Sequence, residues 1–410
     1  MATIQPDPNA VSDDLLKQQE HVYANLYKLD DDEEETKNHG SVLMQFIKNM
    51  RPGMDTTSVI CPTFVLRPIS FLEFEAHYSQ PNLSFLRSAH EKEPIQRMLC
   101  IVEWLLATFT VTPAKGFEGL KPYNPVLGEQ FHCAWEHDDG SITECHSEQI
   151  SHHPPIAAVY IENVKHHIVY SSTGEFRSRF RGNYVDSGVE GTHKLTLSNL
   201  DEHYEITFPH LLARGILWGT ARVEHGGDYI VECEKTNLVC KINFDKGDHE
   251  LKGGIRYINK DEKLFEYKGN LAGTVTLTSY VDETGKKLKE KKNEIIIDSK
   301  NMKREKLVVK PVSEQKPNES RRRWHEVTYA LKTKQLDLAN KKKTEIEEYQ
   351  RYLAKLRKEG QVPMYVPELF TYTGQDVPKI GTPIYKYKND VRDTQNGASS
   401  SDAGVEDDLD

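Results

Sequence analysis

The chain has 410 residues and a formal net charge of −10 at pH 7, and its acidic balance lies at the two ends. Residues 1–39 carry ten acidic residues against three lysines, and the last ten residues carry five acids and no base, so residues 40–400 are close to +2. No run of ~20 apolar residues is present, and no apolar stretch follows a basic N-terminus, so we expect neither a membrane-spanning helix nor a signal peptide. We expect disordered acidic tails over residues 1–39 and 389–410, because such segments bury too little apolar surface to fold.

A short apolar helix is predicted directly after the first tail. Ser41 suits its N-cap, an apolar face recurs over residues 42–50, and Arg51-Pro52-Gly53 ends it. Packing on the core is the plain interpretation of this face, and a mobile lid over a cavity is the functional one. The candidate lid residues are Leu43, Phe46, Ile47 and Met50.

The central part of the chain predicts a helix followed by many strands. The helical pattern runs from Pro94 to Thr110, and alternation begins beyond Leu127. Strands are predicted at Ile156–Ile161, Ile168–Ser172, Lys194–Leu197, Tyr204–Phe208, Tyr229–Cys233, Val239–Phe244, Ile255–Ile258, Leu264–Tyr267 and Gly273–Tyr280. Short strands separated by Asn/Asp/Gly turns are typical of a sandwich or a barrel, and an antiparallel barrel of this length is large enough to enclose a cavity.

The last third of the chain returns to a helical pattern. Residues Ser320–Lys358 contain neither glycine nor proline and carry apolar stripes, so they are predicted to be strongly helical. Residues 361–387 are rich in proline and are predicted to be extended.

Six cysteines are present, at positions 61, 100, 133, 145, 233 and 240, and none forms a Cys-x-x-Cys pair. In a chain of this size, that spacing is typical of reduced, intracellular thiols. None of the histidines and cysteines between His132 and His167 matches the spacing of a zinc site, so no metal and no cofactor is expected.

Three short motifs carry the functional information. The first motif is Lys121–Glu129 (KPYNPVLGE), the second is Glu148–Pro155 (EQISHHPP) and the third is Gln315–Trp324 (QKPNESRRRW). The two prolines of the second motif stiffen the chain, so His152 and His153 lie on a rigid corner. Two imidazoles held in this way can donate several hydrogen bonds to one anion, although two surface histidines before a turn are the plain alternative.

The three motifs, in this order, resemble those of the oxysterol-binding-protein-related family of lipid-transfer proteins, over residues 41 to about 370. The resemblance implies a mostly β fold with helices (α+β): a large incomplete antiparallel β-barrel that encloses a lipid tunnel. It also implies an N-terminal helical lid over about residues 40–66, long C-terminal helices and one lipid-binding domain, residues 40–388. The chain resembles the short form of the family, which lacks a PH domain.

The resemblance also implies a headgroup site for phosphatidylinositol 4-phosphate. Its residues would be Lys121, Asn124, His152, His153, Lys343, Glu347 and Arg351. The last three are spaced by four on the predicted helix and therefore share one face. Such charge ladders are also common on solvated helices, where each pair contributes little.

The second lipid is expected to be phosphatidylserine. Residues 51–55 and 62–66 resemble the subgroup that carries this lipid, although Cys61 stands where the subgroup has leucine. Ser178 falls where that subgroup has a serine near the headgroup of the cargo. Sterol is the alternative cargo.

The predicted function is exchange of phosphatidylserine for phosphatidylinositol 4-phosphate, one lipid at a time, between membranes that the protein contacts peripherally. No G-x-S-x-G elbow and no P-loop is present, so no enzymatic turnover is expected. A sterol exchanger, or a phosphoinositide-dependent sensor or scaffold, is the alternative. We expect a cytoplasmic protein at contact sites of the endoplasmic reticulum and plasma membrane, with an unknown docking partner. The basic runs lack interleaved aromatics, which argues against nucleic-acid binding.

Overall fold

The computed structural model describes residues 7, 10–27, 51–57, 65–110, 121–215, 222–244, 247, 249–302, 305–378 and 380–390. The α-helices are α1 (Asp13–Leu26), α3 (Phe71–Tyr78), α4 (Leu83–Arg87), α5 (Pro94–Phe109), α6 (Ser320–Arg323), α7 (His325–Lys332) and α8 (Leu336–Lys358). The strands of the first half are β1 (Leu66–Ser70), β2 (Lys121–Tyr123), β3 (Gln130–Glu136), β4 (Ile142–His152), β5 (Pro155–Asn163), β6 (Ile168–Phe180), β7 (Val185–Leu197), β8 (Glu202–Thr207), β9 (His210–Arg214) and β10 (Arg222–Gly226). Those of the second half are β11 (Asp228–Cys233), β12 (Leu238–Asn243), β13 (Glu250–Tyr257), β14 (Lys263–Asn270), β15 (Thr274–Val281), β16 (Lys287–Asp298), β17 (Leu307–Val308), β18 (Phe370–Asp376) and β19 (Pro383–Tyr387).

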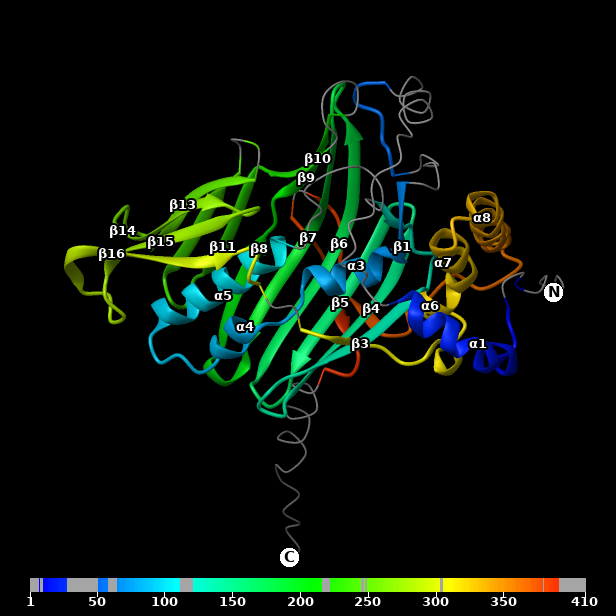
Figure 1. Cartoon of the computed structure of the whole chain (residues 1–410), viewed down its shortest axis with the longest axis horizontal. Coiled ribbons are helices and arrows are strands. Elements are labelled where there is room, and N and C mark those ends of the chain that lie inside the picture. The colour runs from blue at the N-terminus through cyan, green and yellow to red at the C-terminus, as the bar shows by residue number, and fades with distance from the viewer. Residues whose placement is uncertain are drawn as a thin grey trace, which may run out of the picture.

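One antiparallel sheet forms the body of the protein (Figure 1). Thirteen of its fifteen described strands follow the order β16-β15-β14-β13-β12-β11-β8-β7-β6-β5-β4-β3-β17; β9 also pairs with β7, and β10 pairs with β9. The order is linear and ends in β16 and β17, so the sheet is open. The prediction of a mostly β protein with a large incomplete antiparallel sheet is confirmed, and each of the nine predicted strands overlaps an observed one.

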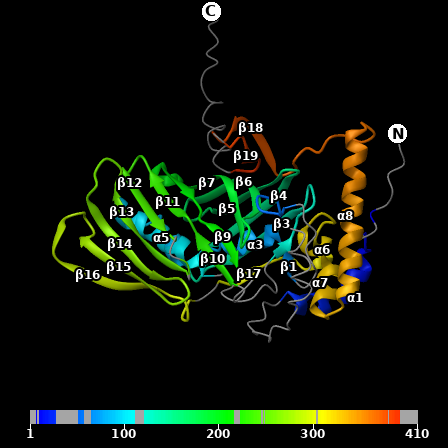
Figure 2. The ribbon, with the colours of Figure 1, turned by 90° about the horizontal axis from the view of Figure 1, so that it is seen from above.

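The two faces of the sheet are covered by different parts of the chain. Figure 2 shows α3 and α5 on one face, where strands β11–β16 curve around α5, and the β18–β19 hairpin on the other. Because neighbouring side chains of a strand point to opposite faces, β5 contributes to both layers. Its residues Ala157, Val159 and Ile161 join the core under α3 and α5, whereas Ala158 and Tyr160 pack with Phe370 of β18.

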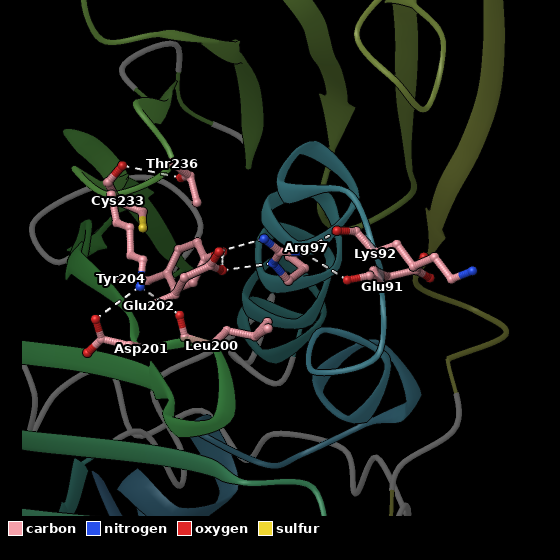
Figure 3. Close-up of polar contacts among 10 residues, drawn as sticks. Glu91, Lys92, Arg97, Leu200, Asp201, Glu202, Tyr204, Cys233 and Thr236 are labelled. Atoms are coloured by element: carbon pink, nitrogen blue, oxygen red, sulfur yellow. Dashed lines mark hydrogen bonds and ion pairs between the residues drawn. The ribbon is translucent and has the colours of Figure 1, made fainter.

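A buried ion pair fixes α5 to the sheet (Figure 3). The guanidinium of Arg97 donates to both carboxylate oxygens of Glu202, at 2.8 and 2.5 Å, and the two side chains are only 7% and 5% exposed. Its remaining nitrogen donates to the carbonyls of Glu91 and Lys92, and the Tyr204 hydroxyl donates to Glu202 at 2.7 Å. Burying these charges is tolerable only because their hydrogen-bonding groups are paired in this way.

The expected disorder of residues 1–39 is corrected for α1. Leu16 and Tyr23 of this helix are buried against Val312, and the carboxylate of Glu20 accepts from the backbone N–H groups of Val312 and Ser313 at 3.2 and 3.0 Å. The acids of this segment also meet a basic one, since Asp13 lies 2.7 Å from Arg322. The net charge of residues 1–39 did not reveal this helix. Net charge takes no account of the partners that the acids find, or of the face that the few apolar residues share.

The single helical stretch expected over Ser320–Lys358 is divided into α6, α7 and α8. The first interruption falls at Trp324, whose side chain is buried. The second is a left-handed Lys334, with φ +61°, after which Gln335 N–H donates to the Ala330 carbonyl at 2.8 Å. This is the Schellman arrangement that usually has glycine at the left-handed position, so a lysine there gave no signal in the sequence.

The candidate lid residues Leu43, Phe46, Ile47 and Met50 lie outside the described residues. No helix in the described ranges combines the length and the apolar content that crossing a bilayer requires.

We predict that Arg97→Met lowers the free energy of unfolding by about 3–5 kcal/mol, because Glu202 would remain buried without its guanidinium partner. Urea denaturation followed by circular dichroism measures this loss. Arg87→Met is the matched control, since the Arg87–Glu91 pair lies at the surface and its loss should cost less than about 1 kcal/mol. Equal losses in the two variants would contradict the role given to the Arg97–Glu202 pair.

Candidate functional site

Glu129, the last residue of the first motif, joins that motif to the third. Its carboxylate accepts hydrogen bonds from four donors within 3.0 Å: Ser70 Oγ, Val126 N, Ser320 Oγ and Trp324 Nε1. The Trp324 ring also stacks on Tyr123 of the first motif, with 4.7 Å between the ring centroids. Burial raises the pKa of Glu129, and the four donors oppose that rise. Two segments about 190 residues apart in sequence are therefore held in one fixed arrangement.

Glu148, the first residue of the second motif, holds the connection between α8 and β18. Its carboxylate accepts from the Tyr365 hydroxyl and from the backbone N–H groups of Glu368 and Leu369, the latter two at 2.7 and 2.8 Å. The Tyr365 ring lies over Gly128, where a Cβ atom would come within 2.8 Å of it. Gly128 also has φ +81°, a region that favours glycine.

A groove of about 680 Å³ lies where the first two motifs face α8. It is lined by residues of β2, of the β4–β5 turn and of one face of α8. The predicted headgroup residues in its lining are Lys121, Asn124, His152, His153, Lys343, Glu347 and Arg351. All seven residues that the sequence nominated for one site are therefore brought together.

The two histidines form the corner of the groove that the prolines predicted. Their rings lie 4.6 Å apart in an edge-to-face arrangement, and the His153–Pro154 peptide is cis. His152 Nδ1 lies 3.0 Å from the Pro125 carbonyl oxygen, which only accepts, so the proton sits on Nδ1 and Nε2 is left for a ligand. Burial lowers the pKa of His152, and the neighbouring His153 contributes to that shift, so the ring is neutral at pH 7.

Lys343 is the buried cation of the groove. Its ammonium group lies 2.5 Å from the carboxylate of Glu347, one helical turn further along α8. Arg351, another turn along, is exposed. Residues four apart on a helix share a face, so the ladder that the sequence predicted lines the groove, with its Arg351 end open to solvent.

The sequence interpretation missed two further cations, Arg357 and Lys358. Both line the groove, and Arg357 Nη1 is buried without a hydrogen-bond partner in the described part of the chain. The spacing of the sequence could have revealed Arg357, because positions 343, 347, 350, 354 and 357 follow one another by three or four residues and therefore lie on one face of a helix.

Ser178 does not line the groove. It is buried in β6, where its hydroxyl lies 2.6 Å from the Thr56 hydroxyl and 2.7 Å from that of Ser187. Thr57, the residue after Thr56, does reach the groove. Ser178 therefore lies close to the groove in the fold but is separated from it by the segment that contains Thr56.

Metal-binding clusters of three or more His, Cys, Asp or Glu residues are absent from the described ranges. The five cysteines that lie within those ranges are all free and buried.

The open antiparallel sheet with a cationic groove beside its C-terminal helices defines a β-rich binding domain, and comparisons with known proteins agree. The family profile described as oxysterol-binding protein matches residues 42–396. Oxysterol-binding protein-related protein 5 of Mus musculus is 35% identical over 365 residues, which cover 86% of this chain and 40% of that protein. Oxysterol-binding protein 4 of Dictyostelium discoideum is 34% identical over 89% of this chain and 77% of its own length. This chain therefore belongs to the oxysterol-binding protein family, and it spans about 40% of the length of the mouse relative.

Solved structures show the same fold. The Osh1 ORD domain in complex with ergosterol superposes with a TM-score of 0.69, at 21% identity, over 95% of this chain and 99% of that one. The Osh3 ORD from Saccharomyces cerevisiae in complex with PI(4)P has a TM-score of 0.62, at 20% identity, over 90% of this chain and 96% of that one.

We predict that Glu148→Gln releases the connection between α8 and β18, because an amide nitrogen cannot accept the hydrogen bonds that one carboxylate oxygen accepts. Hydrogen bonds to a charged acceptor are worth about 1.5–3 kcal/mol, so the backbone amides of Glu368 and Leu369 should exchange about ten- to a hundredfold faster. Hydrogen–deuterium exchange measures this rate. Glu144→Gln, on the exposed end of the same strand, is the control and should leave both amides unchanged. Unchanged exchange in Glu148→Gln would remove the anchoring role.

Proposed function

We propose that this protein is a lipid-transfer protein, and not an enzyme, that binds the headgroup of phosphatidylinositol 4-phosphate in the groove and exchanges this lipid for phosphatidylserine. The observation that carries the proposal is the charge of the groove. Its described lining has five cations, Lys121, Lys343, Arg351, Arg357 and Lys358, against the single carboxylate of Glu347, with two histidines beside them. A groove with this excess of positive charge suits a ligand that carries several negative charges.

A phosphoinositide monophosphate has one phosphate on the inositol ring and one in the diester. Both lose water when they enter a groove, and that loss is compensated only if cations and hydrogen-bond donors meet them. Lysine and arginine supply charge and donors, and Asn124 supplies an amide. Glu347 orients the Lys343 ammonium group and accepts from inositol hydroxyls. His152 enters this site neutral and takes up a proton at Nε2 as a phosphate approaches.

The acyl chains would lie in a tunnel on the concave side of the sheet, closed by the lid segment of about residues 40–66. Moving two acyl chains into an apolar interior offsets their loss from the bilayer, at ~0.8 kcal/mol per CH₂. One site that accepts either lipid but not both allows a phosphoinositide gradient to drive the second lipid between membranes. We place this exchange at contact sites between the endoplasmic reticulum and the plasma membrane.

Phosphatidylserine is the cargo that we favour, on the resemblance of residues 51–55 and 62–66 to the subgroup that carries this lipid. Sterol is the second candidate, and a specific feature of the interior favours it. Glu75 Oε2 and His193 Nε2 are buried and have no hydrogen-bond partner among the described residues. Burial raises the pKa of Glu75 to about 8 and lowers that of His193 to about 4, so both groups are uncharged at pH 7. Neutral interior donors and acceptors suit a hydroxyl group, and the Osh1 ORD domain is in complex with ergosterol.

We predict that Lys343→Met weakens binding of phosphatidylinositol 4-phosphate by about ten- to a hundredfold, because one charge-assisted contact to phosphate is lost and Glu347 is left without its counter-ion. Isothermal titration with a water-soluble, short-chain form of the lipid measures the affinity. Lys342→Met is the matched control, since Lys342 instead pairs with Glu326 at 3.0 Å and does not line the groove. Loss of affinity in both variants, or in neither, would contradict the groove as the headgroup site.

Lipids that copurify with the protein from cells identify the cargo by mass spectrometry. We expect phosphatidylserine and phosphatidylinositol 4-phosphate, and the two lipids together should amount to about one molecule per protein, because the site holds one lipid at a time. Recovery of sterol in place of phosphatidylserine would establish the second candidate. A transfer assay between donor and acceptor vesicles then separates a transporter, which accelerates exchange, from a sensor, which binds without accelerating it.

A further inference from the structure

The connection between α8 and β18 presents two large apolar side chains to solvent beside the groove. Met364 and Val366 are each 73% exposed, more than any other large hydrophobic residue in the described part of the chain. Met364 also lines the groove. Figure 2 shows this connection crossing from the end of α8 to the β18–β19 hairpin.

Their exposure is imposed by the fold and is not the result of a loose segment. Tyr365, between them, turns inward and donates to Glu148, and its ring lies over Gly128. The Pro367 carbonyl accepts from Lys388 Nζ at 2.7 Å. In an extended segment, alternate side chains point in opposite directions, so an inward Tyr365 places Met364 and Val366 outward.

The last two turns of α8 surround these residues with positive charge. Arg351, Lys355 and Lys358 are exposed, and Arg357 lines the groove with Lys358. The acidic groups nearby are Glu359, which lies 3.8 Å from Lys355, and Glu368, which accepts from Gln130 at 2.9 Å. The cations therefore exceed the acids at this edge, and the two apolar residues are exposed beside them.

We propose that Met364, Val366, Lys355 and Lys358, together the groove rim, form a docking surface for an anionic bilayer. Exposed apolar side chains beside lysines suit the interface of a membrane, where the apolar groups enter the acyl boundary and the ammonium groups stay at the headgroups. Because the rim and the groove share Met364 and Lys358, docking brings the groove mouth to the lipid that it receives. The inference rests on the proposed function in that it assumes a lipid ligand.

The experiment compares two double variants in flotation with phosphatidylcholine vesicles that contain phosphatidylglycerol. This anionic lipid is neither proposed ligand, so attachment is measured apart from uptake. We expect Met364→Ser with Val366→Ser to reduce attachment about tenfold, since two apolar contacts are lost. The matched control is Leu83→Ser with Val164→Ser, which removes two apolar residues that are 68% and 59% exposed. Val164 follows the end of β5 that is remote from the groove, roughly 30 Å away at ~3.3 Å per residue, and this variant should attach like the wild type.

A second measurement keeps the test decisive if the first variant alters the fold. An environment-sensitive fluorophore on Val366→Cys should shift to the blue when these vesicles are added, less so at high salt, whereas one on Val164→Cys should not shift. The proposal would be overturned if the labelled protein attached to vesicles without a fluorescence shift at position 366. It would also be overturned if the Met364→Ser, Val366→Ser variant attached within twofold of the wild type. A shift with an acidic protein, but not with vesicles, would have the same consequence. Binding of the short-chain phosphoinositide should stay unchanged in Val366→Ser alone, because Val366 does not line the groove. If the wild type did not bind the short-chain phosphoinositide, the proposed function would be refuted, and the result on membrane docking would still hold.

Discussion

Two buried carboxylates, those of Glu129 and Glu148, determine where the groove lies. Each takes several donors from chain segments far from it in sequence, and each sits at the boundary of a motif rather than among its ligand-facing residues. A buried carboxylate without donors is strongly unfavourable, whereas one that is fully paired fixes the position of every partner. The relative placement of the first motif, the third motif and the α8–β18 connection follows from this requirement.

The groove is preorganised for an anion by pairs that exist before any ligand arrives. Pro125 orients the His152 ring, and Glu347 orients the Lys343 ammonium group. The cations around them repel one another, and this repulsion is relieved when a multiply charged anion enters. Under the proposed function, this arrangement would favour a ligand with more than one phosphate, and the two oriented side chains would lose little freedom on binding.

The sequence allowed much of this arrangement to be predicted, and its failures have physical causes. Alternating patterns identified nine strands, and four-residue spacing placed Lys343, Glu347 and Arg351 on one face of a helix. Periodicity did not reveal β16, because its exposed face is lysine-rich and only Ile297 is fully buried among its residues. The apolar stripe that contains Trp324 and Val327 is buried as the pattern indicated, whereas the break at Lys334 places a non-glycine residue in the left-handed region and had no sequence signal. Ser178 was assigned by resemblance alone, and a resemblance does not specify which neighbours cover a side chain.

The motifs contain two kinds of residue that a sequence cannot separate. Lys121, His152 and His153 face the groove, whereas Glu129, Glu148, Gly128 and Trp324 hold the surrounding segments together. A change in the second group would damage ligand binding through geometry, without any contact to the ligand. The same anchors present Met364 and Val366 outward, since the inward turn of Tyr365 depends on Glu148. The groove and the surface beside its mouth are thus consequences of one buried network, and neither could be repositioned without disturbing the other.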